Sequence, residues 1–276
     1  MSILVNGRSC GCVDVRDRGF QYGDGTFTTL RLRAGKAMLW PWHIGRLADA
    51  CSRLGIRYPG DEALAADLRR LGSAAVEGVI KIQITRGIGG RGYRPVAEGE
   101  PTRVVSLHPA PEFPQDYYRS GVSVRLCRTP LGINSALAGI KHMNRLEQVL
   151  GRGEWTDEFQ EGLMCDTEGF LVEGTMSNVF MVKSGRLETP LIDRCGVAGV
   201  MRRLVLEIAR SRGVEVSERR IRPEELAAAD EVFLTNCVIG IWPVARLAEK
   251  NYPVGALTMM LNRSSEIHQL SEVVAG

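Results

Sequence analysis

The chain has 276 residues, of which 44% are hydrophobic and 24% charged, and its formal net charge is +3. These values are those of an ordinary globular protein and exclude a largely disordered chain. The net charge is small for this length and lysine and arginine form no unbroken block, so we expect neither a nucleic-acid-binding arm nor a membrane-binding patch. The arginines suit an anionic small molecule instead.

Cysteine usage and the absence of long apolar runs indicate a cellular compartment. The seven cysteines include no CxxC pair, which favours reduced thiols over a disulfide framework. Cys10 and Cys12 are too isolated to predict a metal site. No basic and then apolar leader opens the sequence, and no apolar run approaches ~18 residues. We therefore expect a cytoplasmic protein that is neither secreted nor membrane-spanning.

The N-terminal part alternates strand-like and helix-like segments. Strands are expected at residues 3–7, 26–33, 79–85 and 103–108, with a further one from the turn at 34–36 through Trp40. Pro41 suits the first position of a helix that ends at Gly55, and residues 62–71 predict a second helix. The apolar stripe of the first helix is Ile44, Leu47, Cys51 and Leu54. Arg46 lies off that stripe.

A glycine-rich segment at residues 87–92 follows the strand at 79–85. It lacks the Lys-Ser/Thr of a P-loop and the following helix of a dinucleotide site, so a phosphate-cradle interpretation is weak. We interpret it as a flexible rim that carries Arg91 and Tyr93. Prolines then interrupt regular structure at 109, 111 and 114. The sequence thus predicts a smaller N-terminal α+β domain at 1–108, a linker at 109–121 and a larger C-terminal α+β domain at 122–276.

The C-terminal part is expected to contain several short strands and three helices. The strands are expected at residues 122–127, 162–166, 170–173, 178–182 and 230–234. Glu173 ends a largely apolar strand, and its burial would require a cationic or hydrogen-bonding partner. Residues 200–208 predict a helix whose first turn exposes backbone N–H groups, a natural phosphate site. Residues 257–274 are expected to form a closing helix.

Lys141 lies at a predicted loop-to-helix junction. Met143, Leu146, Val149 and Leu150 recur at helical spacing, which predicts a helix of about three turns beginning near the lysine. A lysine in such a place is ordinarily a solvated surface residue. The spacing alone therefore assigns it no function.

The segment from Ala138 to Gln148, AGIKHMNRLEQ, resembles the lysine segment of the aminodeoxychorismate lyases. These lyases are fold-type IV pyridoxal-phosphate enzymes, a family that also includes branched-chain and D-amino-acid aminotransferases. The resemblance continues, in the family's order, over nearly the whole chain. The further segments are residues 17–25, 43–47, 85–93, 173–180, 196–202 and 236–244.

The mixture of strands and helices without regular βαβ alternation indicates an α+β protein of two layered domains. The resemblance implies the two-domain fold-type IV architecture, that of D-amino acid aminotransferases, in a homodimer with pyridoxal 5′-phosphate as cofactor. It also implies that Lys141 binds the cofactor covalently and that Glu173 keeps the ring nitrogen protonated.

For the cofactor phosphate, the resemblance implies Arg46 and the backbone N–H groups of Val200 and Met201 as partners. Asn236 and Cys237 are further candidates on the phosphate side.

The resemblance favours a lyase of folate biosynthesis that converts 4-amino-4-deoxychorismate into 4-aminobenzoate and pyruvate. The alternative is a fold-type IV aminotransferase acting on D- or branched-chain amino acids. Those aminotransferases commonly carry an acidic residue after the aromatic that corresponds to Phe27, whereas this chain has Thr28-Thr29. An extra carboxylate would repel a dianionic substrate. Candidates for contacting the substrate are Thr29, Arg91 and Arg103.

A third reading is a non-catalytic protein that only binds pyridoxal phosphate. It predicts loss of the lysine, of the nitrogen partner or of the phosphate arginine. Lys141, Glu173 and Arg46 are all present, which favours an enzyme.

Overall fold

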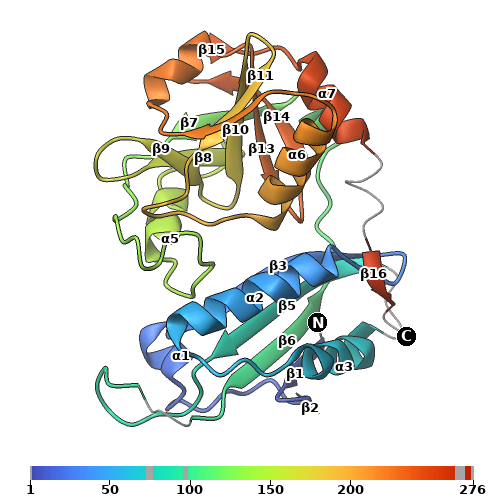
Figure 1. Ribbon diagram of the computed structural model, residues 1–276, viewed down its shortest axis with the longest axis vertical. Helices are drawn as coiled ribbons and strands as arrows, with labels where there is room; N and C mark the ends of the chain where they lie inside the picture. The colour runs from blue at the N-terminus through green and yellow to red at the C-terminus, as the bar shows by residue number, and fades with distance from the viewer. Residues whose placement is uncertain (1, 73–76, 96–98, 265–270, 275–276) are drawn as a thin grey trace. The chain divides into compact units, whose positions relative to one another are not determined.

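The computed structural model describes residues 2–72, 77–95, 99–264 and 271–274, and the chain divides into two compact units (Figure 1). The first unit comprises Met1–Glu112, Ile140–Asn144 and Leu270–Gly276, and the second comprises Phe113–Gly139 and Arg145–Gln269. The lysine segment, which we expected in the C-terminal domain, thus groups with the first unit. The physical reason is backbone pairing, because Phe27 N–H donates to the Lys141 carbonyl at 3.0 Å.

Within the described residues, the first unit contains a seven-stranded sheet in the order β16-β4-β3-β5-β6-β1-β2. Its strands are β1 (Ser2–Val5), β2 (Arg8–Ser9), β3 (Gly25–Arg33), β4 (Lys36–Met38), β5 (Glu77–Thr85), β6 (Thr102–His108) and β16 (Ser271–Val274). The helices of this unit are α1 (Arg18–Tyr22), α2 (Trp40–Leu54) and α3 (Asp61–Gly72). The long central strands β3, β5 and β6 are mutually antiparallel.

One face of this sheet is covered by α2 and α3 (Figure 1). Alternate residues of β3 and β5 point to this face, and they form the core with the apolar stripe of α2. Members of this core are Leu30, Leu32, Ile44, Leu47, Cys51, Ile80, Ile82 and Ile84. By the same alternation Thr28 lies on the helix-covered face, whereas Phe27 and Thr29 lie on the opposite face.

The ends of α2 follow its sequence. Pro41 occupies the first helical turn, and Gly55 ends the helix with a positive φ of 61°, a conformation that glycine adopts without strain. The helix therefore presents its apolar stripe to the sheet and carries Arg46 beside it.

The second unit contains, within its described residues, a nine-stranded sheet whose main path runs β12-β11-β10-β13-β14-β7-β8-β9, with β15 paired to β14. Its strands are β7 (Val122–Leu126), β8 (Glu161–Cys165), β9 (Leu171–Gly174), β10 (Asn178–Lys183), β11 (Arg186–Pro190), β12 (Val216–Arg219), β13 (Glu231–Asn236), β14 (Gly240–Leu247) and β15 (Lys250–Asn251). Its helices are α4 (Asp116–Arg119), α5 (Leu146–Arg152), α6 (Val200–Ser211), η1 (Pro223–Ala228) and α7 (Ala256–Arg263).

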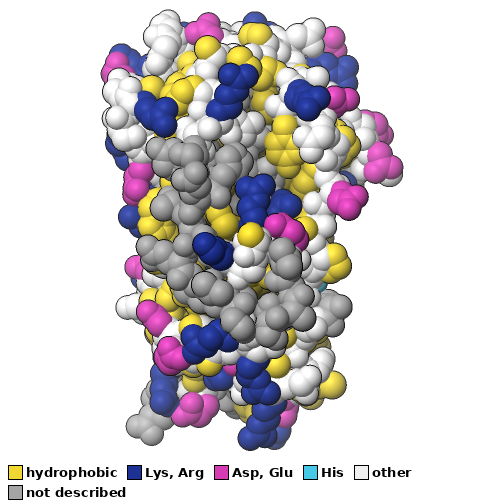
Figure 2. Space-filling model, turned by 90° about the vertical axis from the view of Figure 1, so that its right-hand side faces the viewer, with side chains coloured by type: hydrophobic (Ala, Val, Ile, Leu, Met, Phe, Trp, Pro, Cys, Tyr) yellow, Lys and Arg dark blue, Asp and Glu magenta, His cyan; other side chains and the backbone are white. Residues whose placement is uncertain are grey.

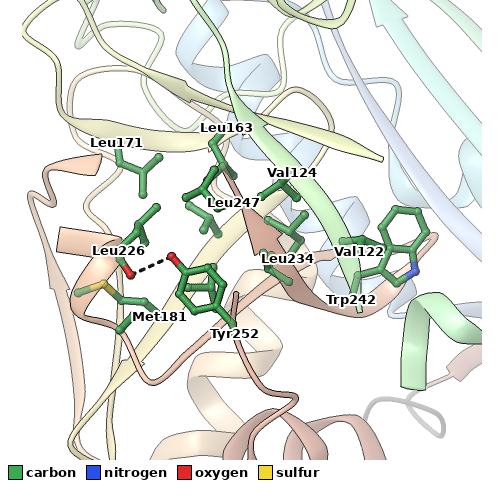
Figure 3. Packing of buried hydrophobic residues seen from close by; sticks show 14 of the residues in the cluster. Val122, Val124, Leu163, Leu171, Met181, Leu226, Leu234, Trp242, Leu247 and Tyr252 are labelled. Atoms are coloured by element: carbon green, nitrogen blue, oxygen red, sulfur yellow. Dashed lines mark hydrogen bonds between the residues drawn. The ribbon is translucent and has the colours of Figure 1, made fainter. Parts of the chain in front are cut away.

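The core of the second unit surrounds Trp242 and Tyr252 (Figure 3). The rings of Phe113 and Tyr117 contact the Trp242 ring edge-on, with centroids 4.9 and 5.3 Å away. The Tyr252 hydroxyl donates to the Leu226 carbonyl at 2.9 Å, so its one polar atom is satisfied inside the core. Phe113 and α4, which lie in the predicted linker, thus belong to this unit.

Two predicted helices differ from the structure. The helix expected near Lys141 begins only at Leu146 and has two turns, because residues 140–144 are extended along β3. Its apolar residues Leu146, Val149 and Leu150 are 75%, 63% and 62% exposed instead of buried. The closing helix expected at 257–274 is confirmed only at its start, since α7 ends at Arg263 and residues 271–274 form β16, paired with β4. Residues 265–270 of the expected helix lie outside the described residues.

The surface agrees with the small net charge. On the face drawn in Figure 2, lysine and arginine side chains alternate with aspartate, glutamate and apolar side chains. No helix among the described residues is long and apolar enough to cross a membrane.

Candidate active site

Lys141 is held in an extended segment beside the start of β3. Its carbonyl accepts hydrogen bonds from the Phe27 N–H and from the Thr26 hydroxyl, both at 3.0 Å. Its ammonium nitrogen Nζ lies 4.5 Å from the centroid of the Phe27 ring. The side chain is half-buried. The ammonium is stabilised by its electrostatic attraction to the face of the Phe27 ring. The backbone of Lys141 is thus fixed while its amine stays on the Phe27 side of the sheet.

A second lysine lies on the same sheet face. Lys81 of β5 is the direct cross-strand partner of Thr29, and its Nζ lies 5.3 Å from the Phe27 centroid. Directly paired residues share a face in an antiparallel sheet. Phe27, Thr29, Lys81 and Lys141 are therefore neighbours. Lys81 was not predicted as a site residue, although the alternation along β5 places it on the face opposite to the buried isoleucines.

Arg103 lies on the other face of this sheet. Its cross-strand partner is the buried Ile84, and its Nε donates to Asp67 of α3 at 2.6 Å. Asp67 is only 2% exposed and needs this cation. The structure thus does not bring Arg103 together with Thr29, the other strand candidate.

Arg91 is exposed in the segment after β5. Arg18 anchors this segment by donating to the carbonyls of Gly92 at 2.9 Å and Tyr93 at 3.2 Å. The Arg18 Nε also donates to Asp24 at 2.8 Å. Arg18, which was not predicted as a site residue, thus fixes the part of the predicted rim next to Arg91.

Arg46 contacts a hydroxyl on the helix-covered face. Its Nη2 donates to Thr28 Oγ1 at 2.5 Å, and the same oxygen lies 2.6 Å from His43 Nδ1. Thr28 and His43 are both 0% exposed. Position 28 therefore belongs to the surroundings of Arg46. The effect of an acid at position 28 on a substrate stays a prediction.

Glu173 of β9 is 4% exposed, and its Oε2 accepts the Val197 N–H at 2.8 Å. Burial lowers the pKa of Arg145, while the carboxylates of Glu173 and Glu147 act in the opposite direction. The buried carboxylate thus has the hydrogen-bonding and cationic partners that its burial requires.

The loop before α6 is built around Asn178. The Asn178 amide donates to the Val197 carbonyl at 2.9 Å. A Cβ on Gly199 would lie 2.0 Å from Asn178 Oδ1, so this position demands glycine. Gly199 caps α6 without a side-chain hydrogen bond. The first-turn N–H groups next to the buried Val200 and Met201 therefore receive no capping side chain, as an anion site requires.

The same loop is tied to the chain just before Lys141. Gly139 N–H donates to the Gly196 carbonyl at 2.9 Å, and Ala198 N–H donates to the Gly139 carbonyl at 3.1 Å. Glu173, the start of α6 and the residue two positions before Lys141 are thus parts of one hydrogen-bonded arrangement.

Asn236, at the end of β13, uses its side chain for the protein backbone. Its Oδ1 accepts the N–H groups of Val238 and Ile239 at 2.8 and 2.9 Å, and its Nδ2 donates to the Met176 carbonyl at 3.1 Å. Its side chain thus shapes the turn that contains the half-buried Cys237.

Glu161, which was not predicted from the sequence, is buried beside the turn that follows Glu173. Its carboxylate accepts the N–H groups of Thr175 and Met176, both at 3.1 Å, and the Ser177 hydroxyl at 2.8 Å. Burial raises the pKa of Glu161, against the lowering effect of these hydrogen bonds. The turn that carries the Asn236 contact is thereby fixed.

Comparison with known proteins identifies the family. Residues 25–247 match the amino-transferase class IV family, and the chain belongs to it. The family and the α+β fold class predicted from the sequence are thus confirmed.

Three relatives span nearly the whole chain. The chain is 37% identical over 267 residues to an aminodeoxychorismate lyase of Vibrio harveyi, and the match covers 93% of this chain and 97% of the lyase. A crystal structure of 4-amino-4-deoxychorismate lyase from Pseudomonas aeruginosa matches with a TM-score of 0.90 at 48% identity. This match covers 94% of this chain and 96% of the lyase chain. A putative branched-chain-amino-acid aminotransferase of Methanocaldococcus jannaschii is 31% identical over 272 residues, and the match covers 95% of this chain and 94% of the aminotransferase.

Proposed function

We propose that the chain is a pyridoxal-phosphate-dependent lyase that converts 4-amino-4-deoxychorismate into 4-aminobenzoate and pyruvate. The observation that carries this proposal is the identity of 48% to a lyase of this name over 94% of the chain. The identity to the putative aminotransferase is lower, 31%.

The residues present fit the cofactor. An amine for covalent attachment is supplied by Lys141, whose backbone is fixed by β3. A buried carboxylate for the ring nitrogen is supplied by Glu173. Arg46 and the uncapped first turn of α6 would hold the phosphate, since a guanidinium and free N–H groups are the donors that phosphate prefers.

When bound, the cofactor supplies an electron sink for the pair left behind by a removed proton. The Lys141 amine would take the proton from the ring carbon that bears the substrate's amino group. Breaking the bond between the ring and the enolpyruvyl oxygen then makes the ring aromatic. The enolpyruvyl fragment gains one proton to become pyruvate, and the Lys141 ammonium can donate it. No water or 2-oxo acid is consumed.

Two carboxylates of the substrate require cations. Lys81 supports such a role because it lies on the face that carries Thr29, Phe27 and the Lys141 amine. Arg91 stays a candidate in its exposed segment. Arg103 is the weaker candidate, since Asp67 holds it on the other face.

The decisive experiment incubates the purified protein with 4-amino-4-deoxychorismate in the absence of any 2-oxo acid. We expect stoichiometric pyruvate and 4-aminobenzoate over many turnovers. An aminotransferase would stop after one turnover, because it needs an amino acceptor to regenerate its cofactor. Rapid amino-group exchange between an amino acid and a 2-oxo acid, with no pyruvate from 4-amino-4-deoxychorismate, would establish the aminotransferase alternative instead.

We also propose a homodimer in the cytoplasm. The exposed apolar residues of α5, which are Leu146, Val149 and Leu150, support burial against another chain. The seven cysteines are free thiols, as a reducing compartment would keep them. Sedimentation should give twice the mass of the 30.3 kDa chain. A monomer at micromolar concentration would contradict the first proposal.

A further inference from the structure

Two exposed thiols lie next to each other in the first unit. Cys10 directly follows β2, and only Gly11 separates it from Cys12. Both cysteines are exposed, whereas the other five cysteines of the chain are buried or half-buried. Burial raises the pKa of the Cys51 and Cys195 thiols to about 12. Because the thiolate is the form that attacks a disulfide, these two buried thiols are inert at neutral pH. The chemistry of exposed thiols is thus concentrated at Cys10 and Cys12.

The Cys10 side chain is turned towards the backbone of residue 12. Its Sγ accepts the Cys12 N–H at 3.4 Å and donates to the Cys12 carbonyl at 3.6 Å. A disulfide requires Cα atoms about 4.4–6.8 Å apart, and two residues of fully extended chain span about 6.6–7.2 Å. A bend at residue 11 therefore brings the two cysteines into range. Gly11 permits this bend, since a Cβ at its position would meet nothing within 4 Å and glycine has the widest choice of backbone angles.

Cys10 also lines an open hollow of about 570 Å³ in the first unit. The hollow lies between β1, the end of β2 and the end of α3, and its lining includes Ser9, Arg70 and Leu71. Sites for small molecules commonly measure about 300–1,000 Å³. The Arg70 guanidinium is held in place, because its Nη1 donates to the Gly7 carbonyl at 2.5 Å. A small molecule that carries carboxylates would thus meet a cation in the hollow that Cys10 lines.

We propose that Cys10 and Cys12 form a dithiol site that exchanges reversibly with small anionic disulfides such as glutathione disulfide. The site uses none of the residues assigned to the cofactor or the substrate, so it is independent of the proposed lyase reaction. In a reducing compartment its oxidised form would be transient, as redox-sensing disulfides are.

The exchange takes place in two steps. The Cys10 thiolate attacks one sulfur of glutathione disulfide, the S–S bond of that molecule breaks, and one glutathione leaves as a thiolate. The Cys12 thiolate then attacks the Cys10 sulfur of the mixed disulfide and displaces the second glutathione. Each leaving thiolate takes up the proton that a cysteine has released. Two electrons thus pass from the cysteine pair to glutathione disulfide, which yields one internal disulfide and two glutathione thiols.

The test incubates the reduced full chain in buffers with graded ratios of glutathione disulfide to glutathione. Acid stops the exchange, the remaining thiols are blocked with N-ethylmaleimide, and tryptic peptides are read by mass spectrometry. Trypsin cleaves after Arg8 and Arg16, so the peptide of residues 9–16 holds Cys10 and Cys12 and no other cysteine. An internal disulfide lowers the mass of this peptide by two hydrogens, whereas a mixed disulfide adds one glutathione.

We expect the internal disulfide to be the main oxidised product in the wild type and to increase with the ratio of glutathione disulfide to glutathione. In Cys10→Ser and in Cys12→Ser the mixed disulfide should accumulate instead, because the second thiol that resolves it is missing. Cys127→Ser is the matched control, since it removes a half-buried thiol of the second unit, and it should leave the product unchanged.

The role of Arg70 is tested with two small disulfides of opposite charge, the anionic glutathione disulfide and the cationic cystamine. Arg70→Met should slow exchange with glutathione disulfide by about 2- to 5-fold, the size of one exposed ion pair, and should not slow exchange with cystamine. Arg70→Lys keeps the charge and should exchange at nearly the wild-type rate.

Two results would overturn the dithiol site. One is a wild-type chain that forms only separate glutathione adducts on Cys10 and Cys12, without an internal disulfide at any buffer ratio. The other is oxidation of the half-buried cysteines as fast as that of the peptide of residues 9–16, because the pair would then not be distinguished from other thiols. Equal slowing of both small disulfides by Arg70→Met would overturn the preference for anionic disulfides.

Discussion

Thr29 and Arg103 lie on opposite faces of one sheet, although both were substrate candidates from the sequence. Thr29 shares its face of the sheet with Lys81 and the Phe27 ring. Arg103, on the other face, donates a hydrogen bond to Asp67 of α3. Only one face can contact a given ligand. The two basic residues Lys81 and Arg103 should therefore respond differently to substitution.

Lys81→Met removes a cation from the Phe27 face and keeps most of the side-chain volume. It should raise KM for 4-amino-4-deoxychorismate by about 10- to 100-fold, the size of a lost hydrogen bond to a charged group. Arg103→Met should leave KM near wild type and instead lower stability, because buried Asp67 loses its partner. Steady-state kinetics and thermal unfolding of both variants test this pair, and a KM effect confined to Arg103→Met would reverse the assignment.

Lys141→Ala should eliminate both covalent cofactor attachment and turnover, because the variant lacks the only amine proposed for them. The Phe27 and Thr26 hydrogen bonds to residue 141 involve its carbonyl and survive the substitution. Folding should therefore be retained. Mass spectrometry after borohydride reduction measures the attachment, and a cofactor adduct in the alanine variant would refute the assignment.

Glu173→Gln should separate cofactor binding from catalysis. The amide oxygen can still accept the Val197 N–H, so the loop before α6 keeps its hydrogen bond. A neutral amide cannot stabilise a protonated ring nitrogen by charge, and kcat should fall by at least about 100-fold. Cofactor content near one per chain together with low kcat is the expected result. A glutamine variant with wild-type kcat at neutral pH would be incompatible with the proposed role.

Substitution of glycine by alanine should change the free energy of unfolding in opposite directions at two positions, one in each unit. In Gly199→Ala the new Cβ would overlap Asn178 Oδ1, at a cost of about 1–3 kcal/mol. Cofactor retention should also fall in this variant, because Gly199 directly precedes the first turn of α6. In Gly45→Ala the Cβ meets nothing within 4 Å, and the helical position should gain about 0.5–1 kcal/mol. Urea unfolding of both variants measures the difference; a destabilised Gly45→Ala would contradict the helix geometry.

The carboxylate of Asp24 should make stability depend on acid pH. Burial alone would raise the pKa of Asp24, but the hydrogen bonds from Arg86 and Arg18 outweigh it and lower the pKa below its ordinary 3.8. A depressed folded-state pKa stabilises the protein above the unfolded value, and this stabilisation is lost as pH falls through the folded one. Wild type should therefore lose its advantage over Asp24→Asn below about pH 4. Thermal unfolding between pH 7 and pH 3 tests this, and a constant difference would disprove it.

Local patterns predicted most elements of this fold. The Pro41 and Gly55 signals bound α2 correctly, and the alternation of β3 and β5 gave their faces. The predicted start of the helix near Lys141 was wrong, because backbone pairing with β3 outweighed the helical spacing of the apolar residues between 143 and 150. Such a pairing joins residues more than 110 positions apart, as between Thr26 and Lys141, and no local pattern contains it.

The candidate site was predictable only in part. Lys141, Glu173 and Arg46 came from motifs, and the structure gives each a defined environment. The face on which Arg103 lies was not predicted, because it depends on the register of β6 against β5. Thr28 and His43 were not recognised as partners, since a strand residue and a helix residue meet only after α2 packs on the sheet.

The assignment of Ile140–Asn144 and of β16 to the first unit has a consequence for how the protein is made. When residues 1–112 have emerged from the ribosome, the segment that pairs with Gly25 and Phe27 has not yet emerged. Strand β16, which pairs with β4, emerges later still. The N-terminal sheet therefore cannot be completed during translation until residue 274 has emerged. A fragment ending at Glu112 should consequently be prone to aggregation, because the edge of β4 that faces away from β3 would remain unpaired.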